Sequence, residues 1–342
     1  MDRVSQAVKE LVEEIQRMPE APDPAETDRH AFTLLLSGIA ACRRAPGIPC
    51  HMGYRTLYRC GDEPASEELK AHLFRLYGIY DRESLEKVCM EQFTSGREYE
   101  QFMTFWCDAP LFDLEELEEK GRRAFETRFK RASLFRPYVG ERGFYAWDIN
   151  ERIGLGRLAC ACGIIDRETF DELTDYQVRK AQVFYHTFKD YAVSCICGAV
   201  YDVPGGDEED MLSFLDLNKK LALHLLEEGG AWYRNAWYAP EKREWVSLLP
   251  HNGGCIVSKQ IEEGRAIGYM YRDSRPSEQW ADTGWRFFAG DESDEYSRNP
   301  DNFTIWSLND ICNLDATILG YAEAKEGSAF GRNAKGEWQR ER

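Results

Sequence analysis

Apolar residues recur at helical spacing through most of the first 230 positions. In the first segment they fall on one stripe of a helix, at Val4, Val8, Leu11 and Ile15. The stretch "EAPDPAET" ends this helix, and Thr27 or Asp28 is suited to cap the next one. The same pattern predicts helices over residues 4–18, 28–42, 66–135, 145–200 and 208–228, with interruptions near Gly78, Gly96, Pro110 and Gly163.

Two of the predicted helix joints share a local sequence. "LYGIYDRESLEKV" at 76–88 is echoed by "ACGIIDRETFDEL" at 161–173. In each, a glycine ends one helix, two apolar residues form the turn, and Asp81 or Asp166 is placed as the N-cap of the next helix. Two interpretations stay open, namely convergence on one local solution and duplication of a helical unit.

The pattern changes after Gly230. The chain becomes aromatic and is interrupted by proline and glycine, and from about residue 254 the apolar segments are short, alternating and rich in Ile, Val, Tyr, Phe and Trp. Strands are predicted in "CIVSKQI", "AIGYMYR", "WRFFAG" and "FTIWSLN", and a further short one over 54–58. The predicted fold class is α+β, with a mainly α-helical domain over 1–248 and a small α+β domain over 249–342 that contains a short, mostly antiparallel sheet.

Composition narrows the class of partner. The chain has 342 residues, of which 43% are hydrophobic and 13% aromatic, so it can fill real cores. Its net charge is −17, which argues against nucleic acid or an anionic membrane as partner and permits a basic protein, although many soluble proteins are equally acidic. The N-terminal residues show no secretion signal, and the longest apolar runs are too short for a membrane helix. Together with eleven cysteines in an unsignalled chain, this predicts a cytoplasmic protein with reduced thiols.

The cysteines do not have the spacing of a zinc site. Cys160 and Cys162 form one Cys-x-Cys pair and Cys195 and Cys197 another, both in predicted helices, where residues two apart point in nearly opposite directions. Both pairs also lie among small apolar residues, so they are interpreted as core thiols. A group of Cys50, His51 and Cys60 lacks a fourth ligand. No metal and no cofactor are predicted.

The acidic–aromatic segment "DTGWRFFAGDESDEY", residues 282–296, contains five acids and four aromatic residues. An EF-hand loop that begins at Asp291 would need glycine at its sixth position and glutamate at its twelfth, but these are Tyr296 and Asn302. A pair of catalytic carboxylates lacks supporting sequence features. The remaining interpretations are a solvated acidic turn and a surface that binds another protein.

No catalytic motif is present in the sequence. Nucleophile elbows, phosphate-binding loops and dinucleotide fingerprints are missing, and "GLGR" at 154–157 is too short and lies in a predicted helix. His251 lies four residues before Cys255, a spacing that does not orient a catalytic dyad on a strand. A non-enzymatic protein is therefore favoured.

The C-terminal region resembles a known family. "VSK", "GYMYR", "DTGWRFFAGDE" and "GSAF", within residues 255 to about 330, are similar to motifs of bacterial immunity proteins of polymorphic toxin systems, the thirty-third family in that naming. This chain has Asp-Thr-Gly-Trp where the family has Asp-Ser-Gly-Trp.

The resemblance implies a module that neutralises a basic toxin through surface complementarity. The residues expected to bind the partner are Arg272, Asp282, Trp285, Asp291, Glu292, Glu295 and Tyr296. For Trp285 a core position is an equal alternative, and for Asp294 and Glu295 the alternative is a solvated face.

A second resemblance covers about residues 100 to 205. "YAWDINERIGLGRLACACGIIDRETFDEL" is similar to an uncharacterised bacterial helical domain, with matches at Trp147, Asp148, Arg152 and Gly163. Trp147, Asp148 and Arg152 are candidates for a cleft in the helical domain, and a surface ion pair between Asp148 and Arg152 is the alternative.

Three functional hypotheses follow from these patterns. The first is a toxin-neutralising binding protein, the second is an intracellular enzyme or ligand-binding protein with a cleft in the helical domain, and the third is an adaptor whose helical domain selects the partner. The sequence predicts no oligomeric state.

Overall fold

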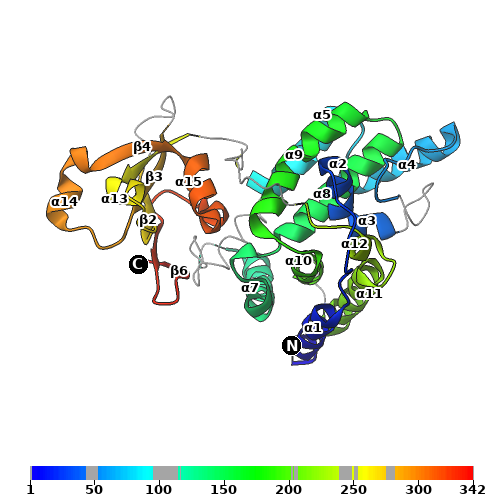
Figure 1. The fold of residues 1–342 in the computed structure, drawn as a ribbon, viewed down its shortest axis with the longest axis horizontal. Helices are drawn as coiled ribbons and strands as arrows, with labels where there is room; N and C mark the ends of the chain where they lie inside the picture. Colours follow the sequence, from blue (N-terminus) through cyan, green and yellow to red (C-terminus); the bar gives the residue numbers. More distant parts are fainter. Residues whose placement is uncertain are drawn as a thin grey trace. The chain divides into compact units, whose positions relative to one another are not determined.

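A computed structural model describes residues 2–43, 53–94, 115, 117–201, 203, 207–238, 249, 253–274 and 282–341. The chain separates into two compact units (Figure 1). The first, called the helical unit, contains residues 1–93 and 130–243, and the second, called the sheet unit, contains 94–129 and 244–342. The domain boundary predicted at residue 249 stays a prediction.

Helices form nearly all of the regular structure in the described part of the helical unit. They are α1 (Asp2–Arg17), α2 (Arg29–Leu36), α3 (Gly38–Cys42), α4 (Glu63–Tyr77), α5 (Arg82–Thr94), α7 (Glu119–Val139), η2 (Gly140–Arg142), α8 (Tyr145–Ala161), α9 (Arg167–Phe184), α10 (Phe188–Tyr201), α11 (Glu208–Leu226) and α12 (Ala231–Arg234). Helix α7 begins in the sheet unit's residue range and ends in that of the helical unit. Within the described residues, none of the helices has the length and apolar character required for a membrane span.

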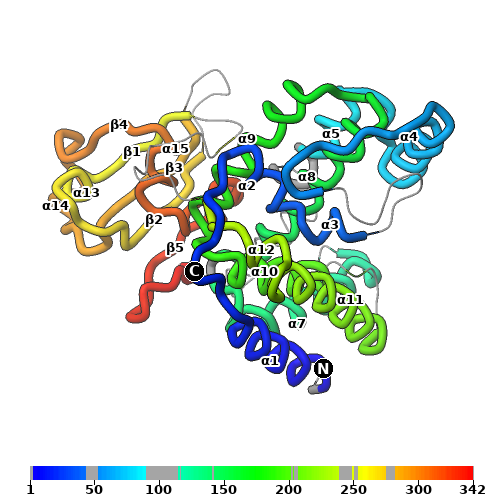
Figure 2. The backbone as a smooth tube through the Cα atoms, turned by 45° about the vertical axis from the view of Figure 1, so that its right-hand side comes forward, coloured from blue at the N-terminus to red at the C-terminus, as the bar shows by residue number. Residues whose placement is uncertain are grey.

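Helix α8 lies at the centre of the helical unit, where it packs against α9 and α10 (Figure 2). The approach of α10 is close because residue 198 is glycine: a Cβ atom there would lie 2.4 Å from the Cβ of Trp147. A second part of the core is aromatic, with the rings of Phe188 and Trp232 stacked at 5.5 Å. The indole of Trp232 also donates a hydrogen bond to the carbonyl oxygen of Leu35 over 2.8 Å, which fixes α12 to α2.

The two joints that share a sequence have the same local structure. Gly78 and Gly163 have φ angles of 69° and 78°, a conformation that glycine adopts without strain. Asp81 accepts a hydrogen bond from the backbone N–H of Ser84 over 2.8 Å, and Asp166 accepts one from that of Thr169 over 2.9 Å. The predicted caps are confirmed. Asp28 likewise caps α2, by accepting from the N–H of Ala31 over 2.7 Å.

The sheet unit contains six strands among the described residues. Its elements are β1 (Gly254–Ser258), α13 (Lys259–Glu262), β2 (Tyr269–Arg272), β3 (Asp282–Phe288), α14 (Asp294–Arg298), η3 (Pro300–Asn302), β4 (Phe303–Ser307), α15 (Leu308–Leu314), η4 (Ala316–Tyr321), β5 (Ala329–Arg332) and β6 (Trp338–Arg340). The strand order is β4-β1-β3-β2-β5-β6. The pairing of β1 with β3 is parallel, and the four other pairings are antiparallel. The predicted α+β class and mostly antiparallel sheet are therefore confirmed.

The strand predictions were correct for β1 to β4 and incomplete beyond them. Strands β5 and β6 have only four and three residues and carry no long apolar run. The strand predicted over 54–58 is wrong, because Tyr54, Arg55 and Thr56 form a bend. In this bend Tyr54 and Arg55 bond to Cys42 and Asn235 instead of pairing with a second strand.

Candidate functional site

The acidic–aromatic segment begins with an internal ion pair on β3. Both carboxylate oxygens of Asp282 accept hydrogen bonds from the guanidinium of Arg286 over 2.9 Å, and one oxygen also accepts from the N–H of Gly284 over 2.8 Å. The hydrogen bonds from Arg286 lower the pKa of Asp282. Asp282 thus holds the start of β3 in place.

Trp285 lies in the interior of the sheet unit, and the half-buried Arg272 lies next to it. The indole of Trp285 is fully buried, its ring centroid lies 5.8 Å from that of Phe287, and its N–H donates to the carbonyl oxygen of Ala322 over 3.0 Å. The guanidinium of Arg272 lies 5.9 Å from this ring and donates to the carbonyl oxygen of Thr283 over 3.0 Å. Of the two alternatives for Trp285, a core residue or a partner-binding residue, the structure shows the core position. Trp285 would therefore affect a partner only indirectly.

The surface of the segment is formed by its last residues, 291–296, called here the acidic loop. Asp291 pairs with Arg265 over 2.7 Å, an interaction that lowers the pKa of its carboxyl. Glu292 accepts hydrogen bonds from the backbone N–H groups of Ala289 and Gly290, over 2.7 and 2.8 Å. Glu295 is exposed in the first turn of α14.

Tyr296 anchors the acidic loop to the sheet. It is half-buried, its hydroxyl donates to the carbonyl oxygen of Asn302 over 3.1 Å, and its ring lies 6.0 Å from that of Phe303. The structure therefore brings Asp291, Glu292, Glu295 and Tyr296 together on one loop beside β4. Glu292 has a structural role in the loop, whereas Glu295 presents its carboxylate to solvent.

Two of the three candidates in the helical unit, Asp148 and Arg152, interact with Lys180 in a polar cluster on α8 and α9. Arg152 is 2% exposed and Lys180 is 1% exposed, so Arg152 is not part of a surface ion pair. Burial lowers the pKa of Lys180 well below its ordinary value; Asp148 opposes this shift and Arg152 adds to it. The ammonium nitrogen of Lys180 lies 3.7 Å from the ring centroid of Tyr145.

Trp147 faces a neighbouring network that sequence reasoning missed. The guanidinium carbon of Arg43 lies 4.6 Å from the ring centroid of Trp147, and a nitrogen of that guanidinium bonds both carboxylate oxygens of Glu151 over 2.7 and 2.9 Å. Asn150 donates to Glu151 and accepts from the N–H of Ala40. Burial raises the pKa of Glu151, against the opposing effects of Arg43 and Asn150. Consecutive polar residues in the apolar helix "YAWDINERIGLG" were the available signal.

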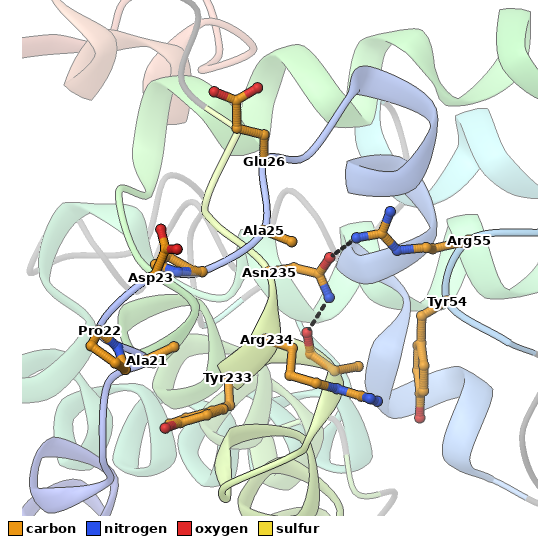
Figure 3. Close-up of a pocket in the computed structure, with 12 residues that line it drawn as sticks. Ala21, Pro22, Asp23, Ala25, Glu26, Tyr54, Arg55, Tyr233, Arg234 and Asn235 are labelled. Carbon is orange, nitrogen blue, oxygen red and sulfur yellow. Dashed lines mark hydrogen bonds between the residues drawn. The ribbon is translucent and has the colours of Figure 1, made fainter.

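A separate cavity of about 860 Å³ opens in the helical unit (Figure 3). It is lined by residues 21–26, by Tyr54 and Arg55, and by the end of α12 and its continuation. Arg55 donates to the side-chain oxygen of the buried Asn235 over 2.7 Å. The side-chain nitrogen of Asn235 in turn donates to the carbonyl oxygen of Ala231. None of the three residues predicted for a cleft lines this cavity. Its walls come from three segments far apart in the chain, so no local pattern indicated it.

The predicted core cysteines are buried free thiols. Cys160, Cys162, Cys195 and Cys197 are at most 3% exposed, and burial raises the pKa of Cys197 to about 12. Among the described residues, no three His, Cys, Asp or Glu side chains gather as ligands of a metal ion would. Cys50, His51 and His251 lie outside the described residues.

Comparison with known families confirms both resemblances. Residues 255–342 match the family model described as Immunity protein Imm33 domain, and residues 72–237 match that described as Protein of unknown function (DUF1266). The second match is wider than the 100–205 expected from the sequence. No curated protein and no solved structure matches the chain.

Proposed function

We propose that this chain is an immunity protein that binds a basic toxin in the cytoplasm and neutralises it through the acidic face of its sheet unit. The match of residues 255–342 to the immunity-protein domain carries the proposal. The geometry supports the choice of face, because Glu295 and Asp291 are exposed on the acidic loop while the large aromatic Trp285 is enclosed. Such a surface attracts a basic protein over long distances and raises its rate of association.

The contacts beneath the acidic loop support the proposed binding role because they hold the loop in a fixed conformation. The Tyr296 hydroxyl fixes the loop to the sheet, and the Asp282–Arg286 pair and the stacked rings of Trp285 and Phe287 order β3, the strand that precedes the loop. A binding face that is already ordered loses little conformational entropy when the partner arrives, so more of the contact energy appears as affinity.

Co-expression tests the proposal. The product of the reading frame next to this gene is induced in cells with and without the full chain, and growth is compared. We expect growth to be restored by the chain, and the purified pair to form a complex whose association slows as salt increases. Loss of growth despite equal expression, together with no complex at low salt, would overturn the proposal.

The cavity in the helical unit favours a second function, the binding of a small anion. Arg55 and Arg234 line it together with Asp23 and Glu26, and among the described residues neither guanidinium has a carboxylate within ion-pair distance. Its volume lies in the range of small-molecule sites. Asn235 holds one nitrogen of Arg55 and leaves the others for a carboxylate or phosphate.

Thermal unfolding with pyrophosphate and with succinate tests the second function. A ligand bound by the folded state alone raises the midpoint of unfolding. We expect a rise that Arg234→Gln abolishes and that the matched exposed variant Arg167→Gln retains. An equal rise in all three proteins would show that the effect is general screening and not binding in the cavity.

A further inference from the structure

Strand β4 forms one edge of the sheet, and half of its backbone groups point outward. Among the described strands it pairs only with β1, with Cys255 opposite Trp306 and Val257 opposite Thr304. In β1, the carbonyl oxygen of Gly254 accepts a hydrogen bond from Thr283 on the β3 side, so Cys255 and Val257 are the residues that bond to β4. The N–H and C=O of Ile305 therefore face away from the sheet.

The outward groups of β4 are accessible. The Ile305 side chain is 79% exposed, and among the described residues no group bonds to the Ile305 backbone on its outer side. By the same alternation the C=O of Phe303 and the N–H of Ser307 point to this side as well. The edge thus offers two donors and two acceptors at the spacing of a strand.

The two edges of the sheet differ in protection. Strand β6, at the far edge, has three residues, ends in Arg340 and has a buried Trp338, which are features that discourage edge pairing. Strand β4 reads Phe-Thr-Ile-Trp-Ser and has none of the lysines, prolines or inward charges that usually protect an edge. An exposed, apolar and unprotected edge is a template for another strand.

Charge identifies the kind of strand that fits. The twenty residues 291–310, which contain β4, include six acids and one arginine, a net charge of −5. Glu262 also reaches this strand, by accepting a hydrogen bond from the indole of Trp306 over 2.9 Å. A second copy of the chain would bring a like-charged segment and a total charge of −17 against this edge, which opposes self-pairing.

We infer that β4 receives an extended segment of the partner, rich in lysine or arginine, as a seventh strand of the sheet. This inference rests on the proposed immunity function and specifies how the partner is held. Up to four backbone hydrogen bonds, to Phe303, Ile305 and Ser307, would supply affinity that is independent of the partner's side chains. The acids on either side of β4 would select basic side chains of the added strand.

The variant Ile305→Pro tests the inference. Proline removes the N–H of residue 305, to which none of the described groups bonds, and proline is tolerated on an edge strand when this group faces solvent. We expect an unchanged midpoint of thermal unfolding and a loss of roughly a hundredfold in affinity for the toxin encoded beside this gene, measured by calorimetry. Ile305→Thr keeps the N–H and the β-branched shape, so its loss should stay below about tenfold.

The outcomes separate this inference from the proposed function. If the wild type binds the toxin and Ile305→Pro, folded, binds it equally well, strand addition is wrong and the immunity role stands. If the wild type does not bind the toxin at all, the proposed function fails and the inference fails with it. A concentration-dependent dimer of the wild type that Ile305→Pro abolishes would identify a second copy as the occupant and overturn the basic partner.

Discussion

The helical unit and the sheet unit differ in the number of positively charged side chains that they bury. Among the described residues, the helical unit buries four cations, Arg131, Arg152, Arg157 and Lys180, whereas the sheet unit buries one, Arg286, which pairs with Asp282. Both units bury aromatic rings, such as Trp232 in the helical unit and Trp285 in the sheet unit, and the sheet unit leaves Asp291 and Glu295 of the acidic loop exposed.

This difference separates a unit with several buried cations from one with a single buried cation that is paired with a carboxylate. Arg157 shows how the helical unit satisfies a buried cation, by donating to the carbonyl oxygens of Leu34 and Gly53 and to the hydroxyl of Ser37. Burying a charge costs free energy that such bonds only partly offset. The sheet unit buries one cation, Arg286, with its carboxylate partner Asp282, and leaves Asp291 and Glu295 exposed, as the proposed association surface requires.

The largest effect on stability is expected from removing the indole of Trp285, which is buried in the sheet unit. Trp285→Ala should lower the free energy of unfolding of this unit by about 3–5 kcal/mol, because it deletes a fully buried indole and its bond to Ala322. Urea denaturation of the full chain, followed by circular dichroism, measures the change. Ile305→Ala is the matched control, since its side chain is 79% exposed and should change stability little. A small loss in Trp285→Ala would contradict the aromatic core.

A substitution in the helical unit should act in the opposite direction. Lys180→Met removes a buried ammonium but keeps a long apolar side chain, so we expect the free energy of unfolding to rise by about 2–3 kcal/mol at neutral pH. Because burial lowers the pKa of Lys180 in the folded state, the unfolded chain binds this proton more tightly. Stability should therefore fall as the pH drops below the ordinary lysine pKa, and Lys180→Met should remove this slope.

The matched control for Lys180→Met is Lys220→Met. Lys220 is an exposed residue of α11 that pairs with Asp216 four positions earlier. It should leave both the stability and its alkaline pH dependence close to those of the wild type. Equal stability and pH dependence of the two variants between pH 7 and 10 would mean that burying the Lys180 ammonium costs no free energy. The contrast between the buried cations of the helical unit and the paired cation of the sheet unit would then be wrong.

A smaller effect on stability is expected from neutralising Asp282, the carboxylate that pairs with Arg286 in the sheet unit. Asp282→Asn removes the acceptor of Arg286 and should lower the free energy of unfolding by about 1–2 kcal/mol. Since the pKa of Asp282 is lowered in the folded state, its contribution is fully present above its unfolded value and is lost as the pH falls through the folded value. Denaturation between pH 2 and 7 should show less acid sensitivity in the variant. Equal acid sensitivity would contradict the role of the pair.

Local features of the chain were predictable from sequence, and long-range ones were not. Asp81 and Asp166 were recognised as caps because a cap depends on residues three positions apart. The burial of Trp285 depends on Ala322 and Phe330, which are distant in sequence, so its alternatives could not be separated. The cavity at Arg55 and Asn235 joins residues 180 positions apart for the same reason.

The smallest change in stability is expected at the exposed acidic loop, where the effect should appear in kinetics. Glu295→Lys reverses a charge at the surface of α14 and should slow association with the toxin several-fold at low salt, with little effect on dissociation. Glu228→Lys makes the same change of net charge in the helical unit, also at an exposed position. If the acidic loop steers the toxin, only Glu295→Lys slows association strongly and weakens its salt dependence. Equal slowing by both variants would assign the effect to the net charge of the chain, and the acidic loop would have no special role in steering.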